Sequence, residues 1–386
     1  MSQVTLTVPA LLEASRAATG LTDFGDEWFL GPLERLVGFV NRDAGLVAAD
    51  AGGGGRIASA LNDRLQLVQY LKDHPAVLEE RIEVACAIIG LPRTGSTMVH
   101  RLLASSPRLT ALYWWETAFP LPLPGEAPGD PTPRQAAARG FVDFLLNEWP
   151  DFESIDPMDA MAVNEEVVLL DRTFLSSTYD SMMPIHEYGY WQADQDHERA
   201  YRELERWMQA IQYQRAQRGE PRRPWVLKTP HHMLGGMSGL LKVFPAAKLI
   251  WTHRDVGQVL PSYCSMCCSL SISTSTRYRK DAEGAHWTRR FRTGLERFMA
   301  LRDSLPEGQV IDLPYQDTAR EPEAVGERLL AALGFTADEQ DRTAMRECIA
   351  ANAREKRPTH KYAAADFGLS ADAIARDFAF YHRRYL

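Results

Sequence analysis

Residues 84–105 constrain the fold of this chain more than any other segment. Residues 84–89 form an unbroken apolar run, which is typical of a strand buried on both faces of a parallel sheet. A glycine-containing loop follows at 90–96, and residues 97–105 have the pattern of a helix. A buried strand that leads through such a loop into a helix predicts an α/β domain.

Later segments repeat this alternation of strand and helix. Three further apolar runs predict strands, at 225–227, 248–252 and 309–313. Helical patterns lie between and after them, at 234–243, 257–270, 287–301 and 323–333. The sequence therefore predicts a P-loop-like, three-layer α/β/α domain with a central parallel sheet.

Two other regions are expected to be largely helical. Residues 21–82 have apolar positions at helical spacing, broken by four glycines at 52–55, and residues 1–82 are expected to form an N-terminal helical cap. The α/β domain is expected to fill 83–386. Within it, residues 119–223 begin with six prolines and continue mostly as helix. We expect this insertion to form a lid over the carboxyl edge of the sheet, on the acceptor side.

Composition narrows the classes of partner. A formal net charge of -8 argues against a broad nucleic-acid-binding surface. No apolar stretch is long enough to span a membrane, and the first twenty residues lack the pattern of a signal peptide. Five cysteines, three of them at 264, 267 and 268, do not make a disulfide framework, so we expect a cytoplasmic protein. The spacing of Cys264 and Cys267 favours packing on a helix over metal binding.

The loop at 90–97 nearly matches a Walker A motif. Its sequence, Gly-Leu-Pro-Arg-Thr-Gly-Ser-Thr, has the GxxxxGK[ST] spacing, but Ser96 stands at the lysine position. The helix N-terminus can still bind an anion through its backbone amides. Arg93 adds a planar set of donors from within the loop. The loop therefore predicts a site for a short anionic group, and less for a triphosphate with magnesium.

A second anion anchor follows the predicted strand at 248–252. His253, Arg254 and Asp255 come directly after it, and Ser262 lies eight residues beyond Arg254 on the next predicted helix. An arginine and a serine so placed can hold one phosphate from two sides at the carboxyl edge of the sheet.

These segments together resemble the PAPS-dependent sulfotransferase superfamily, particularly its bacterial branch and the tyrosylprotein sulfotransferases. The likeness runs from about residue 84 to the end of the chain and is carried by 90–97, 227–232, 244–262 and 362–369. It implies in-line, metal-independent transfer of a sulfuryl group from 3′-phosphoadenosine 5′-phosphosulfate (PAPS) to a hydroxyl group, with the bisphosphate PAP as product. The implied acceptor is a small molecule, a lipid or a glycan.

The resemblance also assigns roles to residues. The residues implied to hold the 5′-phosphosulfate are Arg93, Thr94, Gly95, Ser96 and Thr97. Arg254 and Ser262 would hold the 3′-phosphate, with Arg357 and Lys361 closing over it. Lys228 would lie near the transferring sulfuryl group. Arg93 and Lys228 would thus stabilise the charge that develops on the leaving oxygen.

Two kinds of residue are candidates for the general base. Glu116 ends the aromatic run that follows the P-loop helix, where relatives place a catalytic glutamate, and surrounding aromatic groups could raise its pKa. Histidine is the alternative, and the sequence offers His100, His231, His232 and His253 near the motifs. Glu165 and Glu166 could orient acceptor groups.

Two other functions compete with sulfuryl transfer. A P-loop kinase needs the missing lysine and an acid for magnesium, for which Asp312 is the one candidate. A non-catalytic nucleotide-binding relative would have lost reactive positions, but Arg93, Lys228 and Glu116 are present. An aromatic acceptor cleft is a further prediction, with eight candidate lining residues: Tyr113, Trp114, Trp115, Met158, Met161, Tyr188, Tyr190 and Trp191.

Overall fold

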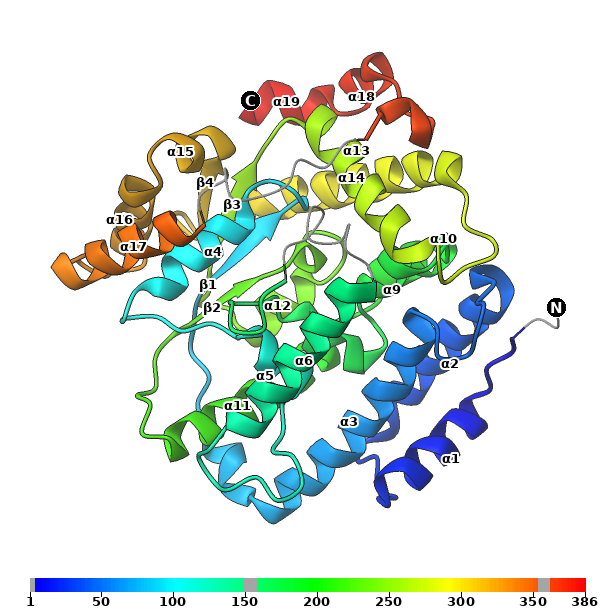
Figure 1. The fold of residues 1–386 in the computed structure, drawn as a ribbon. Helices are drawn as coiled ribbons and strands as arrows, with labels where there is room; N and C mark the ends of the chain where they lie inside the picture. Colours follow the sequence, from blue (N-terminus) through cyan, green and yellow to red (C-terminus); the bar gives the residue numbers. More distant parts are fainter. Residues whose placement is uncertain (1–3, 149–157, 353–361) are drawn as a thin grey trace.

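A four-stranded parallel sheet lies at the centre of the computed structural model, which describes residues 4–148, 158–352 and 362–386 (Figure 1). The strands lie in the order β2-β1-β3-β4. Their bounds are β1 Val84–Gly90, β2 Trp225–Lys228, β3 Lys248–His253 and β4 Val310–Pro314. All four predicted strands are present, each within a residue of its predicted bounds. Because the strands are parallel, their carboxyl ends meet at one edge, where Ile88 lies opposite Lys228 and Gly90 opposite Thr252.

Helices cover both faces of the sheet. Cys86 and Ile88 pack with α4 (Ser96–Ser105), α16 (Pro322–Ala332) and α17 (Glu339–Ala351) on one face. On the other face, Ala87 and Ile89 belong to the largest core cluster, which includes residues of α11 (Glu198–Gln217), α12 (Met237–Val243), α13 (Val256–Ser271) and α14 (Lys280–Arg302). Successive side chains of a strand point to opposite faces, so burial on both sides explains the unbroken apolar run of β1. The predicted three-layer class is confirmed.

The N-terminal region has three helices and differs from its prediction in two respects. They are α1 (Val8–Thr19), α2 (Leu30–Phe39) and α3 (Gly53–Asp73). Helix α1 was not predicted. The glycine run forms the first turn of α3 instead of a break between helices, and glycine is required at residue 54 because a Cβ there would lie 2.2 Å from the carbonyl oxygen of Ala49.

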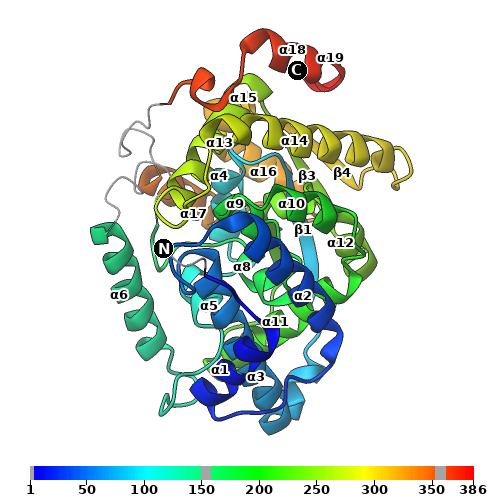
Figure 2. The same cartoon turned by 90° about the vertical axis from the view of Figure 1, so that its right-hand side faces the viewer.

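The N-terminal helices share a core with the middle of the chain. Phe174, Tyr179 and Tyr188 pack in one cluster with apolar residues of α1–α3. Figure 2 shows α2 beside α10 (His186–Ala193), and α9 (Thr178–Met182) belongs to the same layer. The predicted cap at 1–82 and the predicted insertion at 119–223 therefore pack against each other through one apolar core.

The middle region is helical, and part of it reaches the carboxyl edge of the sheet. Besides α9, α10 and α11, it holds α5 (Trp114–Ala118), α6 (Thr132–Glu148) and α8 (Val167–Leu170). The segment before α8 runs beside Tyr113, whose neighbour Trp114 donates its N–H to the Ala162 carbonyl at 2.8 Å. This pairing carries Glu165 and Glu166 to the end of β2.

Three short helices follow β4 in the C-terminal part of the chain. They are α15 (Tyr315–Arg320), α18 (Ala371–Asp377) and α19 (Ala379–Tyr385). All five cysteines are free thiols, and Cys264 and Cys267 are buried on α13, as the packing interpretation predicted. Burial raises the pKa of the Cys264 thiol. Among the described residues, no helix is both long and apolar enough to span a bilayer.

Candidate active site

The turn between β1 and α4 has a backbone shape suited to an anion. Arg93 and Gly95 both have left-handed φ angles, 64° and 81°. A Cβ at Gly95 would lie 2.8 Å from the ring of Tyr315, so only glycine fits there. Helix α4 begins at the next residue, and the first amide groups of a helix have no partner within it. The turn therefore directs amide donors to the carboxyl edge.

Side-chain bonds hold this turn against β3. The Thr94 hydroxyl donates to the Leu91 carbonyl at 2.8 Å and lies 2.6 Å from the Thr252 hydroxyl. Thr252 in turn donates to the Ile89 carbonyl at 3.1 Å. A Cβ at Gly90 would lie 2.7 Å from the Thr252 oxygen, so glycine is also required there. Such contacts offset the cost of the left-handed residue at Arg93, about 1–2 kcal/mol.

The second anion anchor meets the first. The Arg254 Nη1 donates to the Arg93 carbonyl at 2.9 Å, and its guanidinium lies 4.2 Å from the centre of the Tyr315 ring. The Arg93 Nε donates to the Ser262 hydroxyl at 3.2 Å. Asp255 caps α13 by accepting from the Gly257 N–H at 3.0 Å, which fixes the helix that carries Ser262. The structure thus brings Arg93, Arg254 and Ser262 together.

Lys228 adds a third cationic group to this edge. It ends β2, and its Nζ donates to the Thr97 hydroxyl at 3.2 Å and to the Glu165 carboxylate. Its backbone N–H donates to Glu166 Oε2 at 2.8 Å. Lys228 is buried, while about a quarter of the Glu165 side chain is exposed. The ammonium group is therefore held at the start of α4.

The comparisons agree with this geometry. A sequence profile described as "Sulfotransferase family" matches residues 86–339, about two thirds of the chain. The chain belongs to the sulfotransferase family.

Two bacterial sulfotransferases of known structure resemble the whole chain. STF1 from Mycobacterium tuberculosis H37Rv is 26% identical with a TM-score of 0.85, covering 98% of this chain and 100% of its own. STF9 from Mycobacterium avium is 24% identical, also with a TM-score of 0.85, covering 100% of this chain and 98% of its own. No curated protein sequence matches this chain. The predicted bacterial sulfotransferase resemblance is confirmed.

Glu116 of this sulfotransferase, the first candidate for the general base, has a buried ion-pair partner. Its carboxylate accepts from Arg215 through both oxygens, one at 2.8 Å from Nε, and from the Tyr113 N–H at 3.0 Å. Arg215 packs on the ring of Trp225, the first residue of β2, whereas Lys228 is the last. At about 3.3 Å per residue, these ends are about 10 Å apart. Glu116 is thus a buried carboxylate paired with Arg215 near the start of β2, and its role as general base stays a prediction.

The histidines proposed as alternative bases are also committed to other contacts. Burial, with Lys228 nearby, lowers the pKa of His100 to about 3, and burial lowers the pKa of His231 well below its usual value. His253 lies between the Tyr381 hydroxyl at 2.9 Å and Asp312 at 2.8 Å. His232 contacts Glu166. His100 and His231 are therefore poor candidates for the general base, because each buried imidazole would accept a proton only at a cost.

The sequence analysis also named residues for the 3′-phosphate and, in the kinase alternative, an acid for magnesium. Lys361 and Arg357 lie outside the described residues. Asp312, the acid that a kinase would need for magnesium, is paired with Arg302 at 2.5 Å. Burial would raise the pKa of Asp312, but Arg302 and His253 hold it below its usual range. Asp312 is therefore already neutralised by protein cations.

The aromatic residues expected to line one acceptor cleft belong to separate clusters. Tyr188 and Trp191 pack with the N-terminal helices, and Tyr190 contacts Arg289 and His286. A small cluster beside α6 contains the tryptophans and methionines of the set, Trp114, Trp115, Met158 and Met161. Six of the eight residues therefore pack in two separate cores, which does not support one shared cleft.

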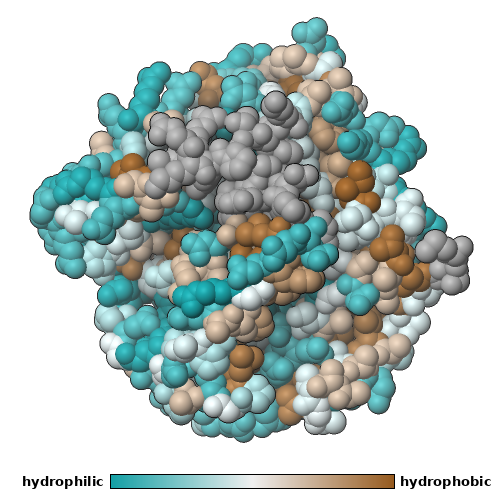
Figure 3. All heavy atoms as spheres, in the orientation of Figure 1, coloured by the Kyte–Doolittle hydropathy of each residue, from teal (hydrophilic) through white to brown (hydrophobic). Residues whose placement is uncertain are grey.

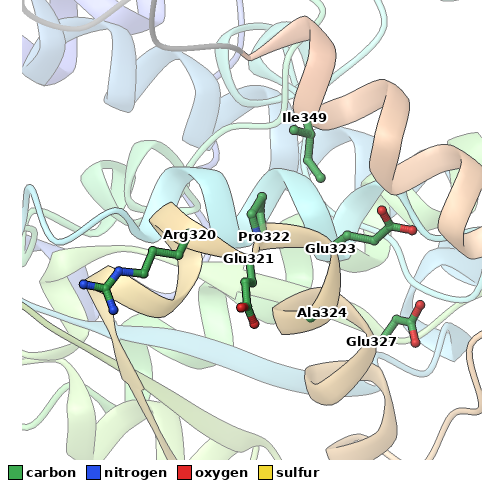
Figure 4. A pocket seen from close by; sticks show the side chains of 7 residues that line it. All are labelled: Arg320, Glu321, Pro322, Glu323, Ala324, Glu327 and Ile349. Carbon is green, nitrogen blue, oxygen red and sulfur yellow. The ribbon is translucent and has the colours of Figure 1, made fainter.

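A hollow of about 490 Å³ elsewhere on the molecule does not suit an anionic donor. It lies among α15, α16 and α17, and Figure 4 shows Arg320 and three glutamates around it. Glu323 and Glu327 pair with Arg346 and Arg342. The net acidic lining would repel phosphate and sulfate groups.

The sequence analysis gave no role to two residues of this site, and it gave a different role to a third. Thr252 reads as an ordinary strand residue, although a threonine at a strand's carboxyl end beside a P-loop is a usable signal. Tyr315 directly follows β4 and supports both Gly95 and Arg254. Glu165 lay in the predicted insertion, and only the structure shows that its carboxylate contacts Lys228.

Replacing Glu116 with Gln should mainly lower stability. Breaking a buried ion pair costs about 3–5 kcal/mol, because Arg215 is left without its counter-charge. Urea unfolding followed by tryptophan fluorescence measures the loss. Asp23→Asn is the control, since that carboxylate pairs with Lys72 at the exposed surface and its loss should barely move the midpoint. A stable Glu116→Gln protein that has lost its activity would restore Glu116 as the base.

Proposed function

We propose that this sulfotransferase moves the sulfuryl group of PAPS to a hydroxyl group of a small-molecule, lipid or glycan acceptor. The observation that carries the proposal is the convergence of Arg93, Arg254 and Lys228 on a P-loop whose lysine position holds Ser96. Three cations with amide donors at a sheet's carboxyl edge suit a ligand with two separate anionic groups.

The residues present fit PAPS. The amides of residues 94–97, with Arg93, would hold the 5′-phosphosulfate. Arg254 and Ser262 would hold the 3′-phosphate, and both contact Arg93, so the two anion sites share one wall. When bound, PAPS supplies an activated sulfuryl group. The donor set consists of planar guanidinium groups and hydroxyls, which match phosphate and sulfate oxygens.

Lys228 and Arg93 provide the electrostatic part of the mechanism. Each is fixed before a ligand arrives: Lys228 by Thr97 and Glu165, and Arg93 by Ser262. Preorganised cations at the point where negative charge develops lower the barrier, and removing one such donor typically costs 10²–10³ in rate.

Glu165 is the residue we assign as general base. Its carboxylate contacts Lys228 Nζ and remains partly exposed, so an acceptor hydroxyl can reach it. Glu116, in contrast, is almost fully buried and held by Arg215. Glu165 would take the hydroxyl proton while Lys228 stays beside Thr97 at the P-loop helix.

Apolar side chains near the middle region suit an acceptor with a nonpolar part. Phe141 and Phe144 of α6 are among the exposed large apolar residues, at 46% and 54% exposure. Figure 3 shows apolar residues in several separate patches on the face of the molecule that it presents. Such exposed apolar surface is typical of ligand-binding sites in soluble enzymes.

Lys228→Met should abolish most of the transfer while leaving the fold intact. Methionine keeps the apolar stem but removes the ammonium group, so the rate should fall about 100- to 1000-fold. Incubation with ³⁵S-labelled PAPS and a panel of hydroxyl compounds measures the rate. Lys242→Met is the matched control, because Lys242 forms only exposed ion pairs with Asp196 and Glu198. Wild-type transfer by Lys228→Met would contradict the proposed electrostatic role, and no transfer by the wild type to any acceptor would contradict the function.

Glu165→Gln should retain PAP binding and lose turnover. The amide cannot take the acceptor proton, so kcat should fall about 10²- to 10⁴-fold. Calorimetry with PAP and the radiolabel assay separate the two effects. Glu187→Gln, an exposed change on α10, should leave both quantities unchanged. Undiminished kcat in Glu165→Gln would move the base to another residue.

A further inference from the structure

Two carboxylates that are adjacent in the sequence bind different groups of Lys228. Glu165 accepts from its ammonium group, and Glu166 Oε2 accepts from its backbone N–H at 2.8 Å. Two carboxylates beside one ammonium group would ordinarily compete for it. Glu166 does not compete here, since its other oxygen is 2.7 Å from His232 Nε2.

A buried chain continues behind Glu166. His232 Nδ1 lies 2.6 Å from the Tyr201 hydroxyl. Glu166, His232 and Tyr201 are each exposed by 1% or less. With its proton on Nε2, His232 can accept from the Tyr201 hydroxyl at Nδ1, while its Nε2 contacts Glu166 Oε1 at 2.7 Å as a close polar pair and not as an aligned hydrogen bond. The chain connects α11, the turn after β2 (Pro230–His232) and the segment before α8.

We propose that Glu166, His232 and Tyr201 are positioning residues that fix the end of β2 and reserve the Lys228 ammonium group for Thr97, Glu165 and the donor. The inference rests on the proposed function, because it assigns the chain's effect to the cation that serves sulfuryl transfer. The three residues act through Lys228, and none of them is given a contact with substrate.

The charge state of Glu166 supports this arrangement. Burial would raise the pKa of Glu166, but His232 and the Lys228 N–H hold it below its usual value. The groups that face it come from four elements. They are Lys228 on β2, His232 after it, Tyr201 on α11 and His100 on α4, with Glu165 next in the chain.

Two of these neighbours do not titrate near neutral pH. The pKa of His100 is lowered to about 3 by burial and by Lys228, and burial raises the pKa of Tyr201 well above 10. Removing His232 should therefore raise the pKa of Glu166. Glu166 would then take up a proton as pH falls through this higher value, so activity would be lost at a higher pH on the acid side than in the wild type.

The test compares His232→Leu with His232→Gln in the full-length enzyme. Leu cannot form a polar contact with the carboxylate, so kcat should fall at least tenfold. The KM for PAPS and the Kd for PAP should stay at their wild-type values. The acid limb of the plot of kcat against pH should move to higher pH. Gln presents an amide N–H near the Nε2 position and should keep kcat within about threefold of the wild type. Equal losses in both variants, or wild-type kcat in His232→Leu, would overturn the inference.

If His232→Leu does not fold, the variant Tyr201→Phe tests the same inference. Tyr201→Phe removes one hydroxyl and should lower kcat about three- to tenfold with PAP affinity unchanged. Tyr179→Phe is its control, because that buried hydroxyl donates to the Asp171 carbonyl at 2.9 Å, away from Lys228. Unchanged kcat in Tyr201→Phe would overturn the inference.

A double variant separates positioning from general stability. Since the chain acts through the ammonium group, adding Tyr201→Phe to Lys228→Met should lower the remaining rate no further. An additive loss would show that Tyr201 acts by another route. Absence of transfer in the wild type itself would instead refute the proposed function and is distinguished in the same assay.

Discussion

The contact between Thr94 and Thr252 joins the P-loop to the end of β3, and the anion site depends on it. Their hydroxyls lie 2.6 Å apart, and each also bonds a carbonyl of the β1 end, Leu91 or Ile89. With the loop held there, Arg254 can bond the Arg93 carbonyl, and Arg93 can reach Ser262. The left-handed backbone at Arg93 is therefore part of a connected set of bonds that places two guanidinium groups at one edge.

The cation that the loop lacks comes from a neighbouring strand. Ser96 replaces the Walker lysine, and Lys228 at the end of β2 instead brings an ammonium group to Thr97, the next residue of α4. An ammonium group that is paired with Glu165, on a residue whose backbone N–H is bound by Glu166, has little freedom to follow a long triphosphate. The kinase alternative also loses its acid, because Asp312 is paired with Arg302 and His253.

Local patterns predicted the sheet and the turn between β1 and α4, but not the partners of buried charges. Apolar runs marked all four strands, and the P-loop spacing marked Arg93 and Gly95, because these features lie within a few residues. The partner of Glu116, Arg215, lies 99 residues away and the Glu165–Lys228 contact spans 63, so local sequence could predict neither pairing. Helix α1 did have signals, a Thr7 cap and Gly20 in a left-handed conformation at its end.

Calorimetry with three nucleotides tests the central claim, that the edge holds a 3′-phosphate as well as a 5′ anion. Charge-assisted bonds from Arg254 and Ser262 to the 3′-phosphate should make PAP bind roughly 10- to 100-fold more tightly than AMP. Mg·ATP should bind weakly, since the loop has no lysine for its terminal phosphates. Tight binding of Mg·ATP, with equal affinities for PAP and AMP, would contradict the account.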